Sequence, residues 1–240
     1  MESAVTTLDE LVRVRSISSD PAHLPEVRRS AQLLDSRLRA LGFTSRVLEL
    51  PGMLPTVIGV RGVRSDRPAA LLYARHDAQP AGNPAAWTAD PFEPHRRGTR
   101  SIGRGSADDK AGIIAHLAAI AALDDSTAPE IVVLLDGGEE IGSPGFAGLL
   151  RDAMLDIDPQ LTIVHHGINW ERGVPSVTTS LRGHLAVDVT ITVMAAQAHT
   201  GINGGPVIDA ATGLSHSPRV SASSARTTSC LGCGSRAQSR

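Results

Sequence analysis

Residues 130–146 read EIVVLLDGGEEIGSPGF, an apolar run that ends in an acidic, glycine-rich turn. Two similar apolar runs are PAALLYA at 68–74 and LTIVH at 161–165. None of the three alternates apolar with polar residues, which is typical of strands buried on both faces in a parallel sheet. Between two of these runs lies AGIIAHLAAIAAL at 111–123, which is apolar on most sides and is predicted to be a helix.

A further helix is predicted over residues 21–41. Its apolar residues recur at steps of three and four, as Val27, Ala31, Leu34 and Leu38 illustrate, and Gly42 follows at the C-cap position. Strands alternating with helices predict an α/β fold with a mostly parallel sheet flanked by helices.

Residues 184–194 (HLAVDVTITVM) show a different pattern. Apolar and polar residues alternate there, as in a strand with one face in water. We therefore expect one domain over 1–182 and the beginning of a second, antiparallel α+β domain over 183–214. Residues 215–240 contain four arginines, eight serines, both cysteines and no acidic residue, so they are predicted to be a separate, disordered tail.

Composition excludes several broad classes of protein. The 240 residues are 41% hydrophobic and 20% charged, with a net charge of -2, which is ordinary for a soluble globular chain and gives no case for nucleic acid. No apolar run approaches the ~20 residues of a membrane span. The first residues, MESAVTTLDELVRV, have no signal-peptide pattern, so the expected compartment is the cytoplasm.

Three acidic clusters follow predicted strands or precede a predicted helix: RHD at 75–77, GRGSADDKAG at 103–112 and DGGEEIGSPG at 136–145. Carboxylates gathered at one sheet edge repel one another unless a cation neutralises them, and divalent metals commonly do so. The alternatives are structural: Asp108 is a helix N-cap and Glu139-Glu140 a solvated turn.

The ordered succession of LLYARHDAQPAGNPAAW, GRGSADDKAG, DGGEEIGSPGF, SLRG and AHTGINGG, within residues 8–214, resembles the dinuclear zinc peptidase family of carnosine dipeptidases, aminoacylases and glutamate carboxypeptidases. The resemblance implies a zinc-binding α/β domain interrupted by a lid domain that also forms the dimer. It implies two zinc ions that share a bridging aspartate and a water, and a glutamate base that activates this water. Residues 1–182 then correspond to part of the zinc domain and 183–214 to the start of the lid.

The same resemblance assigns roles by position. Asp108 matches the bridging metal ligand and Glu140 the next ligand, while Glu139 matches the general base. Asp77 matches the residue that orients the first metal-binding histidine. His199 matches a lid histidine that reaches the partner subunit's site, although without the resemblance it reads equally well as a polar residue at a strand end.

Two positions depart from the pattern in ways that affect metal binding. Arg75 stands where the family has a metal-binding histidine, and a guanidinium has no lone pair for zinc. His76 lies one residue late, on the opposite side of a strand, and could replace that ligand only if the strand end bulges. His166 stands in place of a ligand aspartate and remains a competent zinc donor.

Two functions follow as competing hypotheses. The first is a zinc-dependent dipeptidase acting on a dipeptide or N-acyl amino acid, with a possible homodimer through the lid. The second is a catalytically inactive, truncated member with a damaged metal site. A frameshift near codon 214 is our hypothesis for the tail, whose single pair Cys230 and Cys233 lacks the second pair of a structural zinc site.

Overall fold

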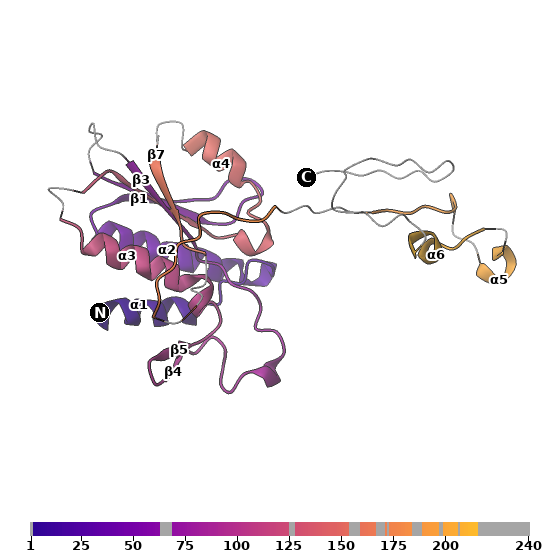
Figure 1. Ribbon diagram of the computed structural model, residues 1–240, viewed down its shortest axis with the longest axis horizontal. Coiled ribbons are helices and arrows are strands. Elements are labelled where there is room, and N and C mark those ends of the chain that lie inside the picture. The colour runs from indigo at the N-terminus through magenta and orange to yellow at the C-terminus, as the bar shows by residue number, and fades with distance from the viewer. Residues whose placement is uncertain are drawn as a thin grey trace. The chain divides into compact units, whose positions relative to one another are not determined.

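The computed structural model describes residues 2–62, 69–124, 128–153, 159–166, 171, 173–183, 189–196, 199–205 and 207–215. The chain divides into two compact units, Met1–Pro175 and Ser176–Arg240, which are treated separately below (Figure 1).

The first unit alternates helices and strands along the chain. Its helices and helical turns are α1 (Glu2–Arg13), η1 (Pro21–His23), α2 (Leu24–Ala40), η2 (Pro84–Ala86), η3 (Ser106–Lys110), α3 (Ala111–Ala121), η4 (Glu139–Ile141) and α4 (Phe146–Ala153). Its strands are β1 (Thr44–Leu48), β2 (Thr56–Arg61), β3 (Ala69–Arg75), β4 (His95–Arg97), β5 (Arg100–Ile102), β6 (Ile131–Asp136) and β7 (Pro159–Val164).

Five of these strands form one sheet in the order β1-β2-β6-β3-β7, and β4 pairs with β5 in a separate hairpin. Strand β6 runs parallel to β3 and β3 parallel to β7, whereas β2 is antiparallel to both β1 and β6. Four of the five strands therefore point in the same direction. The predicted α/β fold with a mostly parallel sheet is confirmed.

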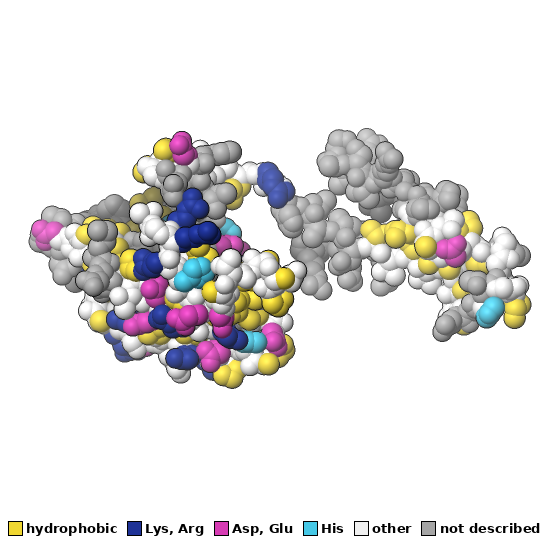
Figure 2. All heavy atoms as spheres, turned by 90° about the horizontal axis from the view of Figure 1, so that it is seen from below, with side chains coloured by type: hydrophobic (Ala, Val, Ile, Leu, Met, Phe, Trp, Pro, Cys, Tyr) yellow, Lys and Arg dark blue, Asp and Glu magenta, His cyan; other side chains and the backbone are white. Residues whose placement is uncertain are grey.

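The surface of the first unit carries charges of both signs. Figure 2 shows acidic and basic side chains interspersed over one of its faces. Several charged side chains of this unit form ion pairs between distant segments, such as Arg13 with Glu93 at 2.8 Å and Arg15 with Asp90 at 2.9 Å. Exposed pairs of this kind contribute little to stability.

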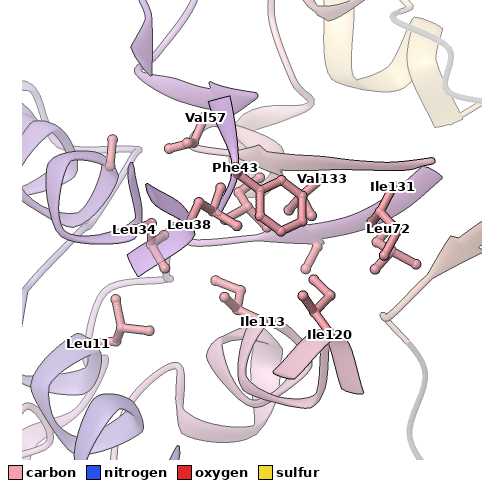
Figure 3. Close-up of a cluster of buried hydrophobic side chains, with 13 residues drawn as sticks. Leu11, Leu34, Leu38, Phe43, Val57, Leu72, Ile113, Ile120, Ile131 and Val133 are labelled. Carbon is pink, nitrogen blue, oxygen red and sulfur yellow. The ribbon is translucent and has the colours of Figure 1, made fainter. Parts of the chain in front are cut away.

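The core lies on both faces of the sheet. Ile131, Val133 and Leu135 of β6 pack into a cluster with α1, α2 and α3 (Figure 3), whereas Val132 and Leu134 belong to a second cluster with Leu149 of α4. Figure 1 accordingly shows α1, α2 and α3 on one side of the sheet and α4 on the other. All six residues of β6 are buried, as the continuous apolar run predicts.

Helix α2 buries the face that its sequence predicts. Val27, Ala31, Leu34 and Leu38 are fully buried against the sheet. Gly42 follows the helix with a φ of +81°, a left-handed conformation that glycine adopts without strain.

The described residues of the second unit contain the short helices α5 (Thr200–Asn203) and α6 (Ala210–Ser215) and no strand. The strand predicted at 184–194 is therefore not formed over 189–194, and 184–188 lie outside the described residues. A strand needs a hydrogen-bonding neighbour, and the described part of this unit supplies none. Residues 216–240, with both cysteines, also lie outside the described residues. Within the described parts of the chain, no helix has the length and apolar character needed to cross a bilayer.

Candidate active site

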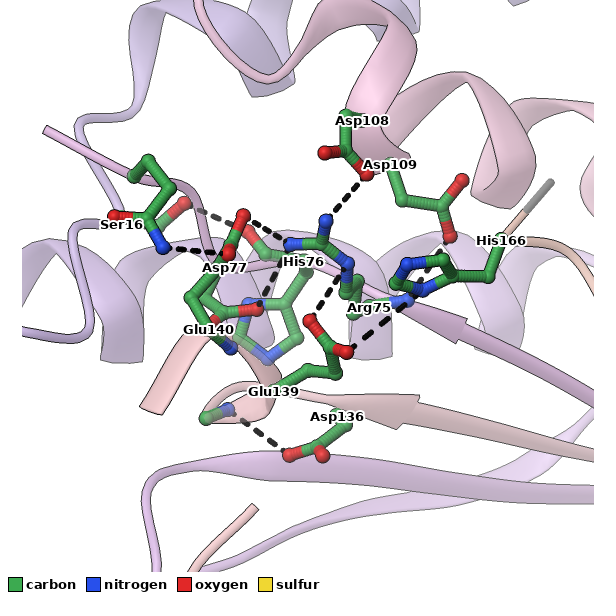
Figure 4. A network of polar contacts seen from close by, with 12 residues as sticks. Ser16, Arg75, His76, Asp77, Asp108, Asp109, Asp136, Glu139, Glu140 and His166 are labelled. Atoms are coloured by element: carbon green, nitrogen blue, oxygen red, sulfur yellow. Dashed lines mark hydrogen bonds and ion pairs between the residues drawn. The ribbon is translucent and has the colours of Figure 1, made fainter. Parts of the chain in front are cut away.

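The three acidic clusters meet at the carboxyl edge of the sheet. Parallel strands β3 and β6 end side by side, with Arg75 opposite Asp136 in the register. Strand β7 ends next to β3 at Val164, and the turn η3 precedes α3 at the same edge. The polar side chains carried by the loops after β3 and β6, by η3 and by the end of β7 consequently lie close together (Figure 4).

The guanidinium of Arg75 stands at the centre of this edge. Its Nη2 bonds to Asp108 of η3 and its Nη1 to Glu140 of η4. Its Nε lies 3.0 Å from Glu139 Oε2, and Nη1 lies 4.0 Å from Asp77 Oδ1. One cation therefore faces carboxylates from three separate segments of the chain, as Figure 4 shows.

Burial and charge act in opposite directions on Arg75. The side chain is only 2% exposed, and burial by itself would lower its pKa. The neighbouring carboxylates of Glu140, Glu139 and Asp108 outweigh the burial, so the pKa of Arg75 is raised above its usual value. This guanidinium is permanently charged.

Asp77 is fully buried beneath the turn that carries Glu140. Its Oδ2 accepts a hydrogen bond from the backbone N–H of Glu140 at 3.0 Å, and Gln79 Nε2 donates to Glu140 Oε2 at 2.7 Å. Burial raises the pKa of Asp77 to about 6. Asp77 thus positions Glu140 through its backbone.

His76 is fully buried and points toward a different loop. Its Nε2 lies 2.9 Å from the carbonyl oxygen of Pro55, so that nitrogen carries the hydrogen and donates. Burial lowers the pKa of His76 to about 4 and keeps the ring neutral. The ring makes none of the contacts that join Arg75 to the acidic side chains, in keeping with the alternation of side chains along a strand.

The end of β7 brings two histidines to the site. His166 Nδ1 is 3.8 Å from Glu139 Oε1, with 43% of its side chain exposed. His165 Nδ1 is 3.1 Å from Asp109 Oδ1, and Oδ2 of the same aspartate accepts the backbone N–H of Arg75 at 3.4 Å. Burial raises the pKa of Asp109, although the contact with His165 opposes this rise.

Sequence reasoning assigned no role to three buried polar residues that shape this edge. Asp109 links Arg75 to His165. Asp136 accepts hydrogen bonds from Ser143 Oγ at 2.6 Å and the Gly138 N–H at 2.9 Å, which closes the loop after β6. Lys110 Nζ donates to the carbonyls that end α1, and burial lowers its pKa to about 7. Their place within the acidic clusters at 103–112 and 136–145 was the available signal.

His199 belongs to the second unit. Its Nδ1 accepts a hydrogen bond from the N–H of Gly201 at 3.0 Å. Its suggested role toward a partner subunit stays a prediction.

The residues present do not fit a divalent metal. Among the described residues, no group of three or more histidine, cysteine, aspartate or glutamate side chains is arranged to hold one. The acids that the sequence nominates as ligands, Asp108 and Glu140, instead point at Arg75. A guanidinium offers no lone pair, so the place that these carboxylates surround is already taken by a cation.

The fold and this edge define the chain as an α/β domain with a polar site at the carboxyl ends of its parallel strands. The model of Peptidase family M20/M25/M40 matches residues 71–231, more than half of the chain. The chain belongs to this peptidase family. The matched range runs past Leu214, where the motifs of the sequence end.

Individual relatives agree with this assignment. The cysteinylglycine-S-conjugate dipeptidase of Corynebacterium striatum is 33% identical over 210 residues, covering 86% of this chain and 46% of the relative. A Cys-Gly metallodipeptidase of Candida albicans is 30% identical over 229 residues, covering 88% and 47% respectively. The chain therefore spans about half the length of these relatives.

Solved structures agree on the fold. A dipeptidase from Saccharomyces cerevisiae superposes with a TM-score of 0.70 at 22% identity. Human carnosine dipeptidase 1 superposes with a TM-score of 0.69, also at 22% identity. Each alignment covers 89% of this chain and 48% of the solved one.

Proposed function

We propose that this acidic edge corresponds to the hydrolytic site of a dipeptidase-like metallopeptidase, the kind of enzyme that cleaves the peptide or amide bond of a dipeptide or an N-acyl amino acid. The observation that carries the proposal is the convergence of Asp77, Asp108, Glu139 and Glu140, from three segments, on one cation. Dipeptidases among the relatives support the substrate class. Zinc as the metal of the lineage, a dimer through residues 183–214 and a cytoplasmic location stay predictions.

Two of the acids differ in a way that suggests different roles. Glu139 keeps 29% of its side chain exposed and lies between Arg75 and His166, so it can exchange a proton with a bound substrate or with water. Asp77 is fully buried and holds the backbone of Glu140. We assign proton transfer to Glu139 and positioning to Asp77.

A specific observation favours a second function for the chain as it stands. Arg75 fills the position that a catalytic cation would need, and it cannot act as a ligand. The second candidate is therefore a catalytically inactive member of the peptidase family. Because Arg75 and a metal ion would compete for the same carboxylates, the two candidates exclude each other for the wild-type chain.

One assay separates the two candidates. Purified protein would be incubated with cysteinylglycine, carnosine or an N-acetyl amino acid, with added Zn²⁺ or with a chelator, and the released amino acid measured. Turnover that the chelator and Glu139→Gln abolish, but Glu93→Gln leaves intact, would establish the dipeptidase. Glu93 is a matched control because it pairs with Arg13 away from the acidic edge. Turnover no higher than that of Glu139→Gln would establish the inactive member.

A further inference from the structure

Arg75 occupies an unusual position for an arginine. It is the last residue of β3, its side chain is 2% exposed, and its three nitrogens each face an acid on another segment. The segments are η3, before α3, and η4, after β6, in addition to the loop that follows β3 itself. Arg75 thus joins Asp108 of η3 to the acids of η4 directly, in addition to the contacts of His165 with Asp109 and of His166 with Glu139 at the end of β7.

The buried acidic side chains beside Arg75 need a cation in order to remain together. Asp77 and Glu140 are 0% and 12% exposed, whereas Asp108 is 68% exposed. Carboxylates so close together and so poorly solvated repel one another. The guanidinium neutralises part of this charge, and its planar fork spreads its donors over three nitrogens, so that it reaches carboxylates on separate segments more widely than the single nitrogen of a lysine would.

We infer that Arg75 takes the place of a metal ion at the acidic edge, so that the site of this protein is a metal-independent ion-pair cluster that holds η3, η4 and the end of β3 in place. This inference rests on the second candidate function, the inactive member of the peptidase family. The same carboxylates would become a cation site if position 75 carried a neutral donor.

The strand geometry explains why the residue at position 75, and not the one at position 76, decides which cation the acidic edge holds. Residue 75 points into the acidic edge, whereas residue 76 points to the Pro55 carbonyl. An imidazole at position 75 would therefore present a lone pair beside Asp108 and Glu140, a donor set that suits zinc. A methionine there would leave the acids facing one another.

The test compares full-length wild type with Arg75→His, Arg75→Lys and Arg75→Met, and with Arg28→His as a matched control. Arg28 pairs with the exposed Glu49 at 3.0 Å, so Arg28→His places a histidine next to an acid outside the cluster. Each protein is loaded with Zn²⁺, desalted and analysed for metal. Its thermal midpoint is measured with Zn²⁺ and with a chelator.

The inference predicts no retained zinc and no change in midpoint with Zn²⁺ or chelator for wild type and Arg28→His. Arg75→His retains zinc, and Zn²⁺ raises its midpoint. Arg75→Met melts about 10 °C lower than wild type because it buries unpaired charge, and Arg75→Lys melts between the two. Zinc retained by wild type, a chelator-sensitive wild-type midpoint or Arg75→Met as stable as wild type would each overturn the inference.

If Arg75→Met cannot be purified, the zinc content of wild type and Arg75→His alone tests the inference. The outcomes also separate the inference from the proposed function. Zinc bound by Arg75→His and not by wild type, without hydrolysis by either, supports the inference and contradicts a dipeptidase site. Zinc bound by wild type together with hydrolysis contradicts the inference and supports the dipeptidase.

Discussion

The side chains of Arg75 and His76 leave the end of β3 toward different partners, the acidic edge and the Pro55 carbonyl. This division was predictable from the sequence, because successive residues of a strand point to opposite faces. The pairing of His165 with Asp109 was not, because it joins residues 56 positions apart whose contact depends on how β7 packs beside β3. The resemblance to known peptidases pointed instead to His166.

A substitution at Gly137 tests how closely the chain packs around His76. A methyl group at position 137 would overlap the Pro55 carbonyl oxygen and come within 2.9 Å of His76 Nε2. We expect Gly137→Ala to lower the free energy of unfolding by about 2 kcal/mol or more, because it breaks a buried hydrogen bond. Gly138→Ala is the matched control, since the nearest atoms to a methyl group there are 3.5 Å away. Equal urea midpoints for the two variants would contradict this description.

His116 gives a pH dependence with a defined sign. The ring is buried on α3, with Nε2 3.1 Å from the Tyr73 carbonyl, and burial lowers its pKa below the usual 6.5. Between the lowered pKa and 6.5 the unfolded chain binds more protons than the folded one, so stability is full above this window and is lost as the pH falls through it.

The matched variant is His116→Gln, which keeps a donor for the Tyr73 carbonyl and does not titrate. Urea denaturation at about pH 5 and about pH 7.5 measures the loss on acidification. Wild type should lose more stability than His116→Gln over this interval. An equal loss in both proteins would show that the histidine is not kept neutral by burial.

At the scale of elements, the three apolar runs were reliable guides. Predicted strands at 68–74, 130–136 and 161–165 are observed at 69–75, 131–136 and 159–164. Strand β2 was not predicted, because Gly59 interrupts its apolar run. A methyl group at Gly59 would lie 3.1 Å from Leu38 Cδ1, so the glycine allows α2 to approach the sheet closely. Such a requirement comes from tertiary packing and has no local signature.

Strand β6 should be highly sensitive to shortening of its buried side chains. Leu135 is fully buried beneath the helices, two residues before Gly137, and Leu135→Ala leaves a cavity in that layer. We expect a loss of roughly 2–5 kcal/mol in the free energy of unfolding. Leu161→Ala on β7, where the side chain is 52% exposed, should cost less than about 1 kcal/mol. Denaturant unfolding of both variants checks the difference, and similar losses would contradict the assigned burial.

At the scale of the whole molecule, the chain belongs to a peptidase family and spans about half the length of the relatives that it matches. The family and the α/β fold were predictable from ordered motifs. That position 75 offers no lone pair to a metal follows from one residue, Arg75. The network of ion pairs that this arginine forms was not predictable from the sequence, because it depends on three segments that meet only when the sheet is assembled.

The edge strand β7 predicts how the molecule behaves at high concentration. Leu161, Ile163 and Val164 are 52%, 44% and 58% exposed on this strand. Exposed apolar edge strands promote association between chains, and a lysine opposes it. We expect light scattering after size-exclusion chromatography to show concentration-dependent association that Ile163→Lys reduces. Leu50→Lys, at a 38% exposed position outside the strands, should leave it unchanged. Association insensitive to Ile163→Lys would exclude the edge as its cause.

The central claim, that Arg75 stands where a metal ion would otherwise neutralise the acidic edge, is tested most directly by the zinc content of wild type beside Arg75→His after loading and desalting. The account predicts negligible zinc in wild type and roughly one zinc ion per chain in Arg75→His. Near-stoichiometric zinc in wild type would contradict it.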